Sequence, residues 1–285
     1  MPRSERLPGI KARPDHGHLG FPPFGVVDGR FRVPTRLPPP LAHRPVQLDD
    51  LDLDEELKES GATLAFTLAT LRGLGAALEL LQAGQAARLL EDLPPPDASV
   101  HNPSLIRCKT SAATLCPPTH VLDIHFADGH EPYRTPVHGL LWALQCPVLA
   151  HLSKRPDCAD AYAMRDNSVL LRLVRVEVPC RPSWPLLHRY IYDGSPAALL
   201  AGLLSPPAAR TQLPSTGKTR SSLNAALDGL VMRLSRVREV WLDAASLEMS
   251  DAALWDTLER AWAVLVAELQ ELVGQAELGD QSQVA

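Results

Sequence analysis

The clearest alternation of apolar and polar positions lies in the stretch 119–204. In its first segment, 121–126, Leu122, Ile124 and Phe126 alternate with Val121, Asp123 and His125, which predicts a strand with one buried and one solvated face. An Asp-Gly pair at 128–129 supplies the turn residues of a tight hairpin. The returning segment contains Pro132 and Pro136, so we expect a short edge strand whose second proline opens a helix.

From Val137 the apolar spacing changes to the steps of three and four that are typical of a helix. The expected stripe consists of Val137, Leu140, Leu141, Leu144, Val148 and Leu149. Pro147 should then end or kink this helix. Residues 169–178, rich in Val and Leu with interleaved Arg, predict a second strand, and 184–192 predict a helix that Asp193-Gly194 ends. The order hairpin, helix pair, strand, helix, helix predicts an α+β unit with a small mixed sheet and packed helices.

Amphipathic segments flank this unit. In 47–93 an acidic run precedes an apolar stripe, so we expect a helix that carries the acids on its N-terminal side. The stripe consists of Leu64, Leu68, Leu71, Leu74, Leu78 and Leu81. We expect a linker over 94–118 and a flexible loop with phosphorylatable serines over 205–221. Residues 222–276 predict two helices that pack on the central unit, and 277–285 form a tail.

The first 46 residues contain ten of the chain's 27 prolines and show no helical period. This composition predicts a disordered, basic, Pro-rich arm. Phe21, Phe24 and Phe31 leave one alternative open, a short linear motif that docks on a folded surface, although a flexible leader is the favoured interpretation. The C-terminal helix is acidic, so the two ends suit pairing with each other or with other proteins.

Composition narrows the class of protein. The net charge of −5 at pH 7 gives no global case for direct nucleic-acid binding. No apolar run approaches the roughly 20 residues that span a bilayer, and the polar start lacks the pattern of a secretory leader. The five cysteines form no CxxC pair. We therefore expect an intracellular protein with free thiols, in the nucleus, the cytoplasm or both, without membrane association.

The residues that carry chemistry favour neither an enzyme nor a cofactor site. The histidines and cysteines around the first hairpin lack the spacing of a zinc site. A hydrolase would need Ser195 or Cys146 as its nucleophile. Its base would be His138, oriented by Asp123, but the chain has no GxSxG elbow. Residues 216–219 resemble part of a phosphate loop without its first Gly. We expect no catalytic, metal-binding or cofactor-binding residues.

Four motifs, in this order, resemble the BTB/POZ family. They are Leu122-Asp123-Ile124, Val137-His138-Gly139-Leu140-Leu141, Cys146-Pro147-Val148-Leu149 and Tyr190-Ile191-Tyr192-Asp193-Gly194. The chain departs from the family where the short, mixed segment 154–167 replaces a longer acidic connector. The resemblance implies a BTB/POZ-like unit over 119–204, in which His138 lies beside the first strand and Asp123 holds its ring. The structural residues that it implies are Asp123, His138, Leu140, Leu141, Tyr190, Tyr192 and Gly194.

The stretches 136–141, 187–194 and 253–265, with the overall layout, resemble the clampless family of basidiomycete fungi. Members of that family regulate mating-type-controlled sexual development. The resemblance implies a non-enzymatic protein–protein interaction regulator of clamp-cell formation and dikaryon maintenance, downstream of mating-type factors. It also implies regulatory proteins as partners, with mating-type homeodomain transcription factors as candidates.

The apolar stripes of the two C-terminal helices are expected to pack on the central unit. The alternative is that Trp255 and Trp262 anchor a partner. Exposed strand edges and helix faces of a BTB-like unit would also allow self-association. Two other functions stay open: a substrate adaptor of a cullin ubiquitin ligase, as some BTB proteins are, and a Cys or Ser hydrolase.

Overall fold

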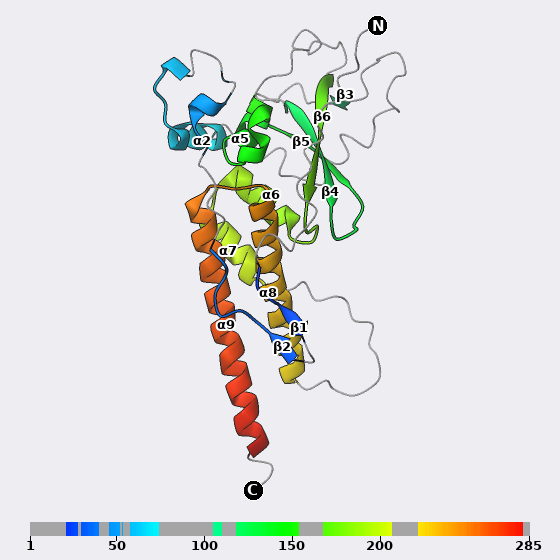
Figure 1. Ribbon diagram of the computed structural model, residues 1–285, viewed down its shortest axis with the longest axis vertical. Helices are drawn as coiled ribbons and strands as arrows, with labels where there is room; N and C mark the ends of the chain where they lie inside the picture. The colour runs from blue at the N-terminus through cyan, green and yellow to red at the C-terminus, as the bar shows by residue number, and fades with distance from the viewer. Residues whose placement is uncertain are drawn as a thin grey trace.

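The computed structural model describes residues 21–27, 30–39, 46–51, 53, 58–73, 105–109, 118–153, 168–206 and 222–281. Figure 1 shows a sheet and short helices at one end and a long pair of helices at the other. The strands are β1 (Gly25–Val27), β2 (Arg30–Arg32), β3 (Leu105–Lys109), β4 (His120–Phe126), β5 (Tyr133–Val137) and β6 (Ser168–Val178). The α-helices are α2 (Leu64–Gly73), α5 (Gly139–Ala143), α6 (Trp184–Asp193), α7 (Pro196–Leu204), α8 (Ser222–Ser246) and α9 (Ala252–Gln281). Two 3-10 helices are η2 (Leu48–Asp50) and η3 (Pro147–Ser153).

The main sheet has four strands in the order β3-β6-β4-β5. β4 and β5 are antiparallel around a turn in which Gly129 has a φ of 81°, so the predicted hairpin is confirmed. β6 lies parallel to β4, and the connection between these strands includes α5 and η3. β5 forms one edge of the sheet, as its proline content predicted. The mixed α+β architecture is therefore confirmed.

The helix predicted from Val137 begins later than expected. Val137 is the last residue of β5 and pairs with β4, because Pro136 continues the hairpin instead of opening the helix. Helix α5 begins at Gly139 and has five residues, and Pro147 then starts η3. Most of the predicted stripe is nevertheless buried in the main core.

Strand β4 is buried on both faces, whereas its alternation predicted one solvated face. Leu122, Ile124 and Phe126 pack in the main core with the helices, as expected. On the other face Val121 packs with Cys108 of β3 in a second, smaller apolar cluster. The neighbouring strands thus bury positions that a single amphipathic strand would leave to water.

Strand β3 corrects the prediction that 94–118 is a linker. Residues 105–109 pair antiparallel with β6 over their full length. The segment has only five residues, with Arg and Lys among them, so its local pattern is too weak to identify a strand.

Helix α2 is attached to the end of α6 through one arginine. Gly194 ends α6 with a φ of 59°, in the left-handed conformation that the Asp-Gly pair predicted. Arg72 Nε donates to the carbonyl oxygen of Ile191 (3.4 Å), and Arg72 Nη2 donates to Gln145 Oε1 (2.7 Å). Gln145 Nε2 donates to the same carbonyl (2.9 Å), so the last turn of α6 gains side-chain donors.

The acidic run does not lie in the first turn of helix α2, as the prediction for 47–93 would require. Helix α2 begins at Leu64, and its first turn holds no acidic residue. Leu51 and Leu53, within the run, are instead buried in the core. Three members of the predicted stripe pack against that core: Leu64, Leu68 and Leu71. The members beyond residue 73 lie outside the described residues.

Helices α8 and α9 confirm the two predicted C-terminal helices, and they lie side by side (Figure 1). An ion pair between Arg233 Nη2 and Glu268 Oε1 (2.6 Å) joins them. Their buried apolar residues share one core with α6, α7 and the sheet. Among the helices that the structure describes, none has the length and apolarity to cross a membrane.

The expected disorder of the arm 1–46 is not confirmed. β1 and β2 pair as a short hairpin, which Figure 1 places beside α8 and α9. Phe21 and Phe24 pack against the main core, because an apolar surface formed by distant residues is available to them. Residues 1–20 and 40–45 lie outside the described part of the chain.

A candidate interaction site on the C-terminal helices

Three tryptophans gather where α8 passes α9. Trp241 on α8 and Trp255 on α9 meet edge to face, with ring centroids 6.1 Å apart. Trp241 and Trp262 are each only 1% exposed, whereas Trp255 is partly exposed and donates its Nε1–H to the carbonyl oxygen of Met249 (2.9 Å). Of the two anchors considered from the sequence, Trp262 is therefore already buried within this chain.

An N-terminal segment, the described part of residues 21–37, buries Trp262; we call it the strap. The Phe21 ring lies edge to face with Trp241 (5.3 Å between centroids) and with Trp262 (6.0 Å). The Phe24 ring lies 5.9 Å from Trp262, whose Nε1–H donates to the carbonyl oxygen of Pro34 (2.9 Å). The docking alternative thus holds for Phe21 and Phe24, while the side chain of Phe31 lies outside the described part.

A cation faces the strap. The guanidinium carbon of Arg238 on α8 lies 5.2 Å from the centroid of the Phe21 ring and 6.0 Å from that of Phe24. Arg238 Nε and Trp241 Nε1 are both buried, and neither meets a hydrogen-bond acceptor among the described residues. Buried donors without acceptors are uncommon and unfavourable. The strap therefore packs against the aromatic rings of this site, but it leaves these two N–H groups without an acceptor among the described residues.

A second polar cluster joins α8 to the loop that leads into α6. Asp243 is fully buried, and its carboxylate accepts hydrogen bonds from the Cys180 N–H (2.8 Å) and the Ser183 hydroxyl (3.3 Å). Burial raises the pKa of the Asp243 carboxyl well above its ordinary value, and the nearby carboxylates of Glu239 and Asp128 raise it further. The two donors lower it without reversing the shift.

Asp243→Asn is expected to stabilise the protein more at about pH 8 than at about pH 5. The folded carboxyl keeps its proton to a higher pH than the unfolded one, so its contribution is present below the unfolded pKa and is lost as pH rises toward the folded pKa. Asn keeps an acceptor for Cys180 and carries no charge. Urea denaturation at both pH values measures the difference, with exposed Asp256→Asn as the control. If Asp243→Asn changes the free energy of unfolding equally at both pH values, the carboxyl of Asp243 does not have a raised pKa in the folded protein.

The structure corrects one contact that the BTB/POZ resemblance implied. Asp123 accepts from Arg134 Nε (2.9 Å) and pairs with His125 Nε2 (3.0 Å), so it does not hold the ring of His138. Burial opposes ionisation of Asp123, but these two partners lower the pKa of its carboxyl. His138 instead packs edge to face on Tyr192 (5.9 Å), and its backbone N–H donates to the Tyr192 hydroxyl (3.3 Å).

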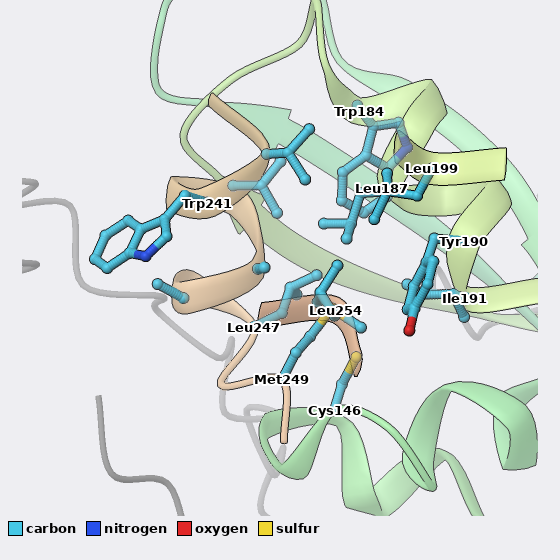
Figure 2. Packing of buried hydrophobic residues seen from close by; sticks show 14 of the residues in the cluster. Cys146, Trp184, Leu187, Tyr190, Ile191, Leu199, Trp241, Leu247, Met249 and Leu254 are labelled. Carbon is cyan, nitrogen blue, oxygen red and sulfur yellow. The ribbon is translucent and has the colours of Figure 1, made fainter. Parts of the chain in front are cut away.

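Tyr190, another residue of that motif set, connects α6 to the C-terminal helices. Tyr190 is buried and donates its hydroxyl to Asp251 Oδ2 (2.8 Å) at the start of α9. Burial and the Asp251 carboxylate raise the pKa of Tyr190. Leu141 is buried and Leu140 is partly buried beside it. Figure 2 shows α6 facing the connection between α8 and α9. The labelled residues are Leu187, Tyr190 and Ile191 of α6, Leu247 and Met249 of the connection, and Leu254 of α9.

The residues considered for a hydrolase have other roles in the structure. Cys146 is fully buried, which raises the pKa of its thiol. Ser195 is the N-cap of α7 and accepts from the Ala198 N–H (3.2 Å). A buried histidine that the sequence did not single out, His188, lies against two tryptophan rings, and burial lowers its pKa to about 4. Within the described ranges, no three His, Cys, Asp or Glu side chains converge on a possible metal position.

Sequence reasoning missed two residues that shape these clusters. Asp243 is the one polar residue in the apolar run 240–245, and that interruption was a usable signal of a buried, hydrogen-bonded carboxylate. Arg238 lies in a mixed, charged sequence and gives no such signal. Its role depends on Phe21 and Phe24, which are more than two hundred positions away.

The fold and the site define an α+β protein whose two long C-terminal helices carry an aromatic surface closed by the chain's own N-terminal segment. A family model described as the Clampless protein 1 C-terminal domain matches residues 195–284, from the N-cap of α7 past the end of α9. Over these residues the chain is similar to the C-terminal domain of the clampless family.

Two relatives define how far this similarity extends. Clampless protein 1 from each of two strains of Cryptococcus neoformans var. neoformans serotype D is 32% identical over 101 residues. That alignment covers 34% of this chain and 20% of the relative, so the chain spans about a fifth of the length of the curated relatives it matches. No solved structure gives a significant match, and the resemblance of the central unit to the BTB/POZ family is not confirmed.

Proposed function

We propose that this protein regulates fungal sexual development by binding other proteins, without catalysing a reaction. The match of residues 195–284 to the Clampless protein 1 C-terminal domain carries the proposal. More specifically, we propose a role in clamp-cell formation and dikaryon maintenance, downstream of mating-type factors. The candidate partners are regulatory proteins, including mating-type homeodomain transcription factors, and a second copy of the chain.

The aromatic site supports a role in protein binding. Tryptophan and arginine are enriched among the residues that dominate binding energy at protein interfaces, and Trp241, Trp262 and Arg238 meet on one surface. In this structure that surface holds a peptide segment of the same chain. A surface of this composition is suited to holding an extended segment of another protein.

Affinity purification from mating cells tests the proposal. The tagged full-length chain should recover transcriptional regulators from mating cells and much less of them from vegetative cells. An untagged strain controls for background, and fluorescence microscopy of the tagged chain tests placement in the nucleus, the cytoplasm or both. Normal clamp cells and a stable dikaryon in a strain lacking the gene would contradict the developmental role.

A cullin-ligase substrate adaptor is the second candidate, because the central unit keeps the order of elements expected of a BTB/POZ-like domain. We infer such a domain from the β4–β5 hairpin, the parallel pairing of β4 with β6, and the helices α6 and α7 that follow. The same purification separates the two candidates. Stoichiometric recovery of a cullin scaffold supports the adaptor, whereas its absence beside recovered transcriptional regulators supports the first proposal.

A further inference from the structure

We propose that the surface under the strap is a peptide-binding site, which the strap occupies within its own chain and which a partner's segment occupies in its place. The segment that fits is proline-rich, with two aromatic residues three positions apart and a carboxylate next to them. The site consists of Trp241, Trp262 and Arg238, and we call it the strap site. This inference rests on the proposed function, because it names the chemistry of the partner and the regulation of the same surface.

The spacing of the strap's aromatic residues is the first step. Phe21 and Phe24 are separated by Pro22-Pro23, which favours an extended helix with three residues per turn. Residues three apart then lie on one face, and both phenylalanine rings do contact Trp262. Aromatic surfaces commonly recognise proline-rich segments in this form, because the segment loses little conformational freedom on binding.

The way in which the strap is attached is the second step. Trp241 and Trp262 are almost fully buried, but Phe21 and Phe24 are only partly buried. β1 and β2 pair with each other and with no other described strand. The strap is thus attached by ring contacts, by the bond from Trp262 Nε1 to the Pro34 carbonyl, and by Val33 and Leu37, which pack against the main core. Another peptide with the same side chains can supply each of these contacts.

The donors without acceptors indicate what the strap lacks. Arg238 Nε and Trp241 Nε1 find no acceptor among the described residues, and residues 21–24 carry no carboxylate. A carboxylate next to the aromatic pair would form a charge-assisted hydrogen bond with the guanidinium. A partner of this kind gains an interaction that the strap does not make, which compensates for the high effective concentration of a tethered segment.

Peptide binding to an opened site tests the proposal. The probe is a fluorescein-labelled synthetic peptide with the sequence of residues 18–36, and the protein is the full chain with Phe21→Ala and Phe24→Ala. Fluorescence anisotropy should give a Kd on the order of 10 μM. Binding to the wild-type chain should be at least about tenfold weaker, because the tethered strap competes. The matched control is Phe66→Ala, which removes a phenylalanine that is 65% exposed on α2 and should bind like wild type.

The acidic preference has its own measurement. A second peptide with Gly20→Asp should bind the opened chain about tenfold more tightly than the first, and Arg238→Gln should abolish that gain while leaving binding of the first peptide in place. Equal binding of the first peptide to the opened, wild-type and Phe66→Ala chains overturns the proposed site. An equal gain with Arg238→Gln overturns the role of Arg238.

A cleavable strap keeps the proposal testable if the double variant unfolds. A specific protease site inserted between residues 39 and 46 is cut in the folded protein, so every strap contact is present at the start. The labelled peptide should then exchange with the cut strap while circular dichroism stays unchanged. Absence of exchange, or unfolding of the body when the strap leaves, shows that the strap is an integral part of the core. Failure here leaves purification of regulators from mating cells unaffected, so the two proposals fail separately.

Discussion

Replacing Leu258 with Asp is expected to unfold the whole protein and not only the end of α9. Leu258 is fully buried on α9 in the core that also holds α6, α7, α8 and the sheet. Losing a buried leucine side chain costs about 2 to 5 kcal/mol, and burying an unpaired carboxylate adds several more. Native domains are stable by only about 5 to 15 kcal/mol, so the sum removes most or all of the stability.

Thermal unfolding followed by circular dichroism in the far and near ultraviolet measures this effect. The matched control is Val264→Asp, on the same helix, where the side chain is 47% exposed and the change should be within about 0.5 kcal/mol. The stacked pair Trp142 and Trp184 lies between α5 and α6 and gives a near-ultraviolet signal from that region. If the signal survives Leu258→Asp while α9 melts, the C-terminal helices and the sheet are separate cooperative bodies.

The elements that sequence predicted correctly are those whose pattern is local. The hairpin of β4 and β5 follows from the period-2 pattern of residues 121–126 and an Asp-Gly turn, and α6 follows from a helical apolar face that ends at Gly194. Helices α8 and α9 are long enough that their apolar period outweighs single exceptions. In each case the residues that decide the structure lie within the element or next to it.

The elements that sequence missed depend on residues far away in the chain. Strand β3 has a weak pattern of its own and is defined by its pairing with β6. Pro136 suits both the first turn of a helix and an edge strand, and only the register with β4 decides for the strand. The same holds for the strap, whose composition favours disorder until Trp241 and Trp262 provide a surface for it.

The candidate site was predictable only in part for the same reason. Trp262 stood out as a large aromatic residue on an amphipathic helix, but its exposure was not predictable, because the strap that buries it starts more than two hundred residues earlier. Phe21 and Phe24 stood out as aromatic residues in a proline-rich segment. Joining the two observations required the three-dimensional structure.

Gly139→Ala is expected to destabilise the protein by about 1 to 3 kcal/mol, and Gly139→Val by more, because no space exists for a side chain there. A Cβ atom at Gly139 would overlap the carbonyl oxygen of Leu152 in η3 and the ring of His120 in β4. The glycine N–H also donates to Thr119 Oγ1 (2.8 Å), so the backbone cannot move away without losing this partly buried hydrogen bond. Urea denaturation of both variants measures the loss.

The matched control for Gly139 is Gly229 in the middle of α8, where an added Cβ would meet no atom within 4 Å. Gly229→Ala should stabilise the protein by about 0.5 to 1 kcal/mol, because alanine restricts the unfolded chain and favours the helix. If the free energy of unfolding falls for Gly139→Ala and rises for Gly229→Ala, the loss at Gly139 is due to packing and not to the general effect of replacing glycine. If Gly139→Ala is as stable as wild type, η3 can shift away from the start of α5, and the close contact between these elements is not required for folding.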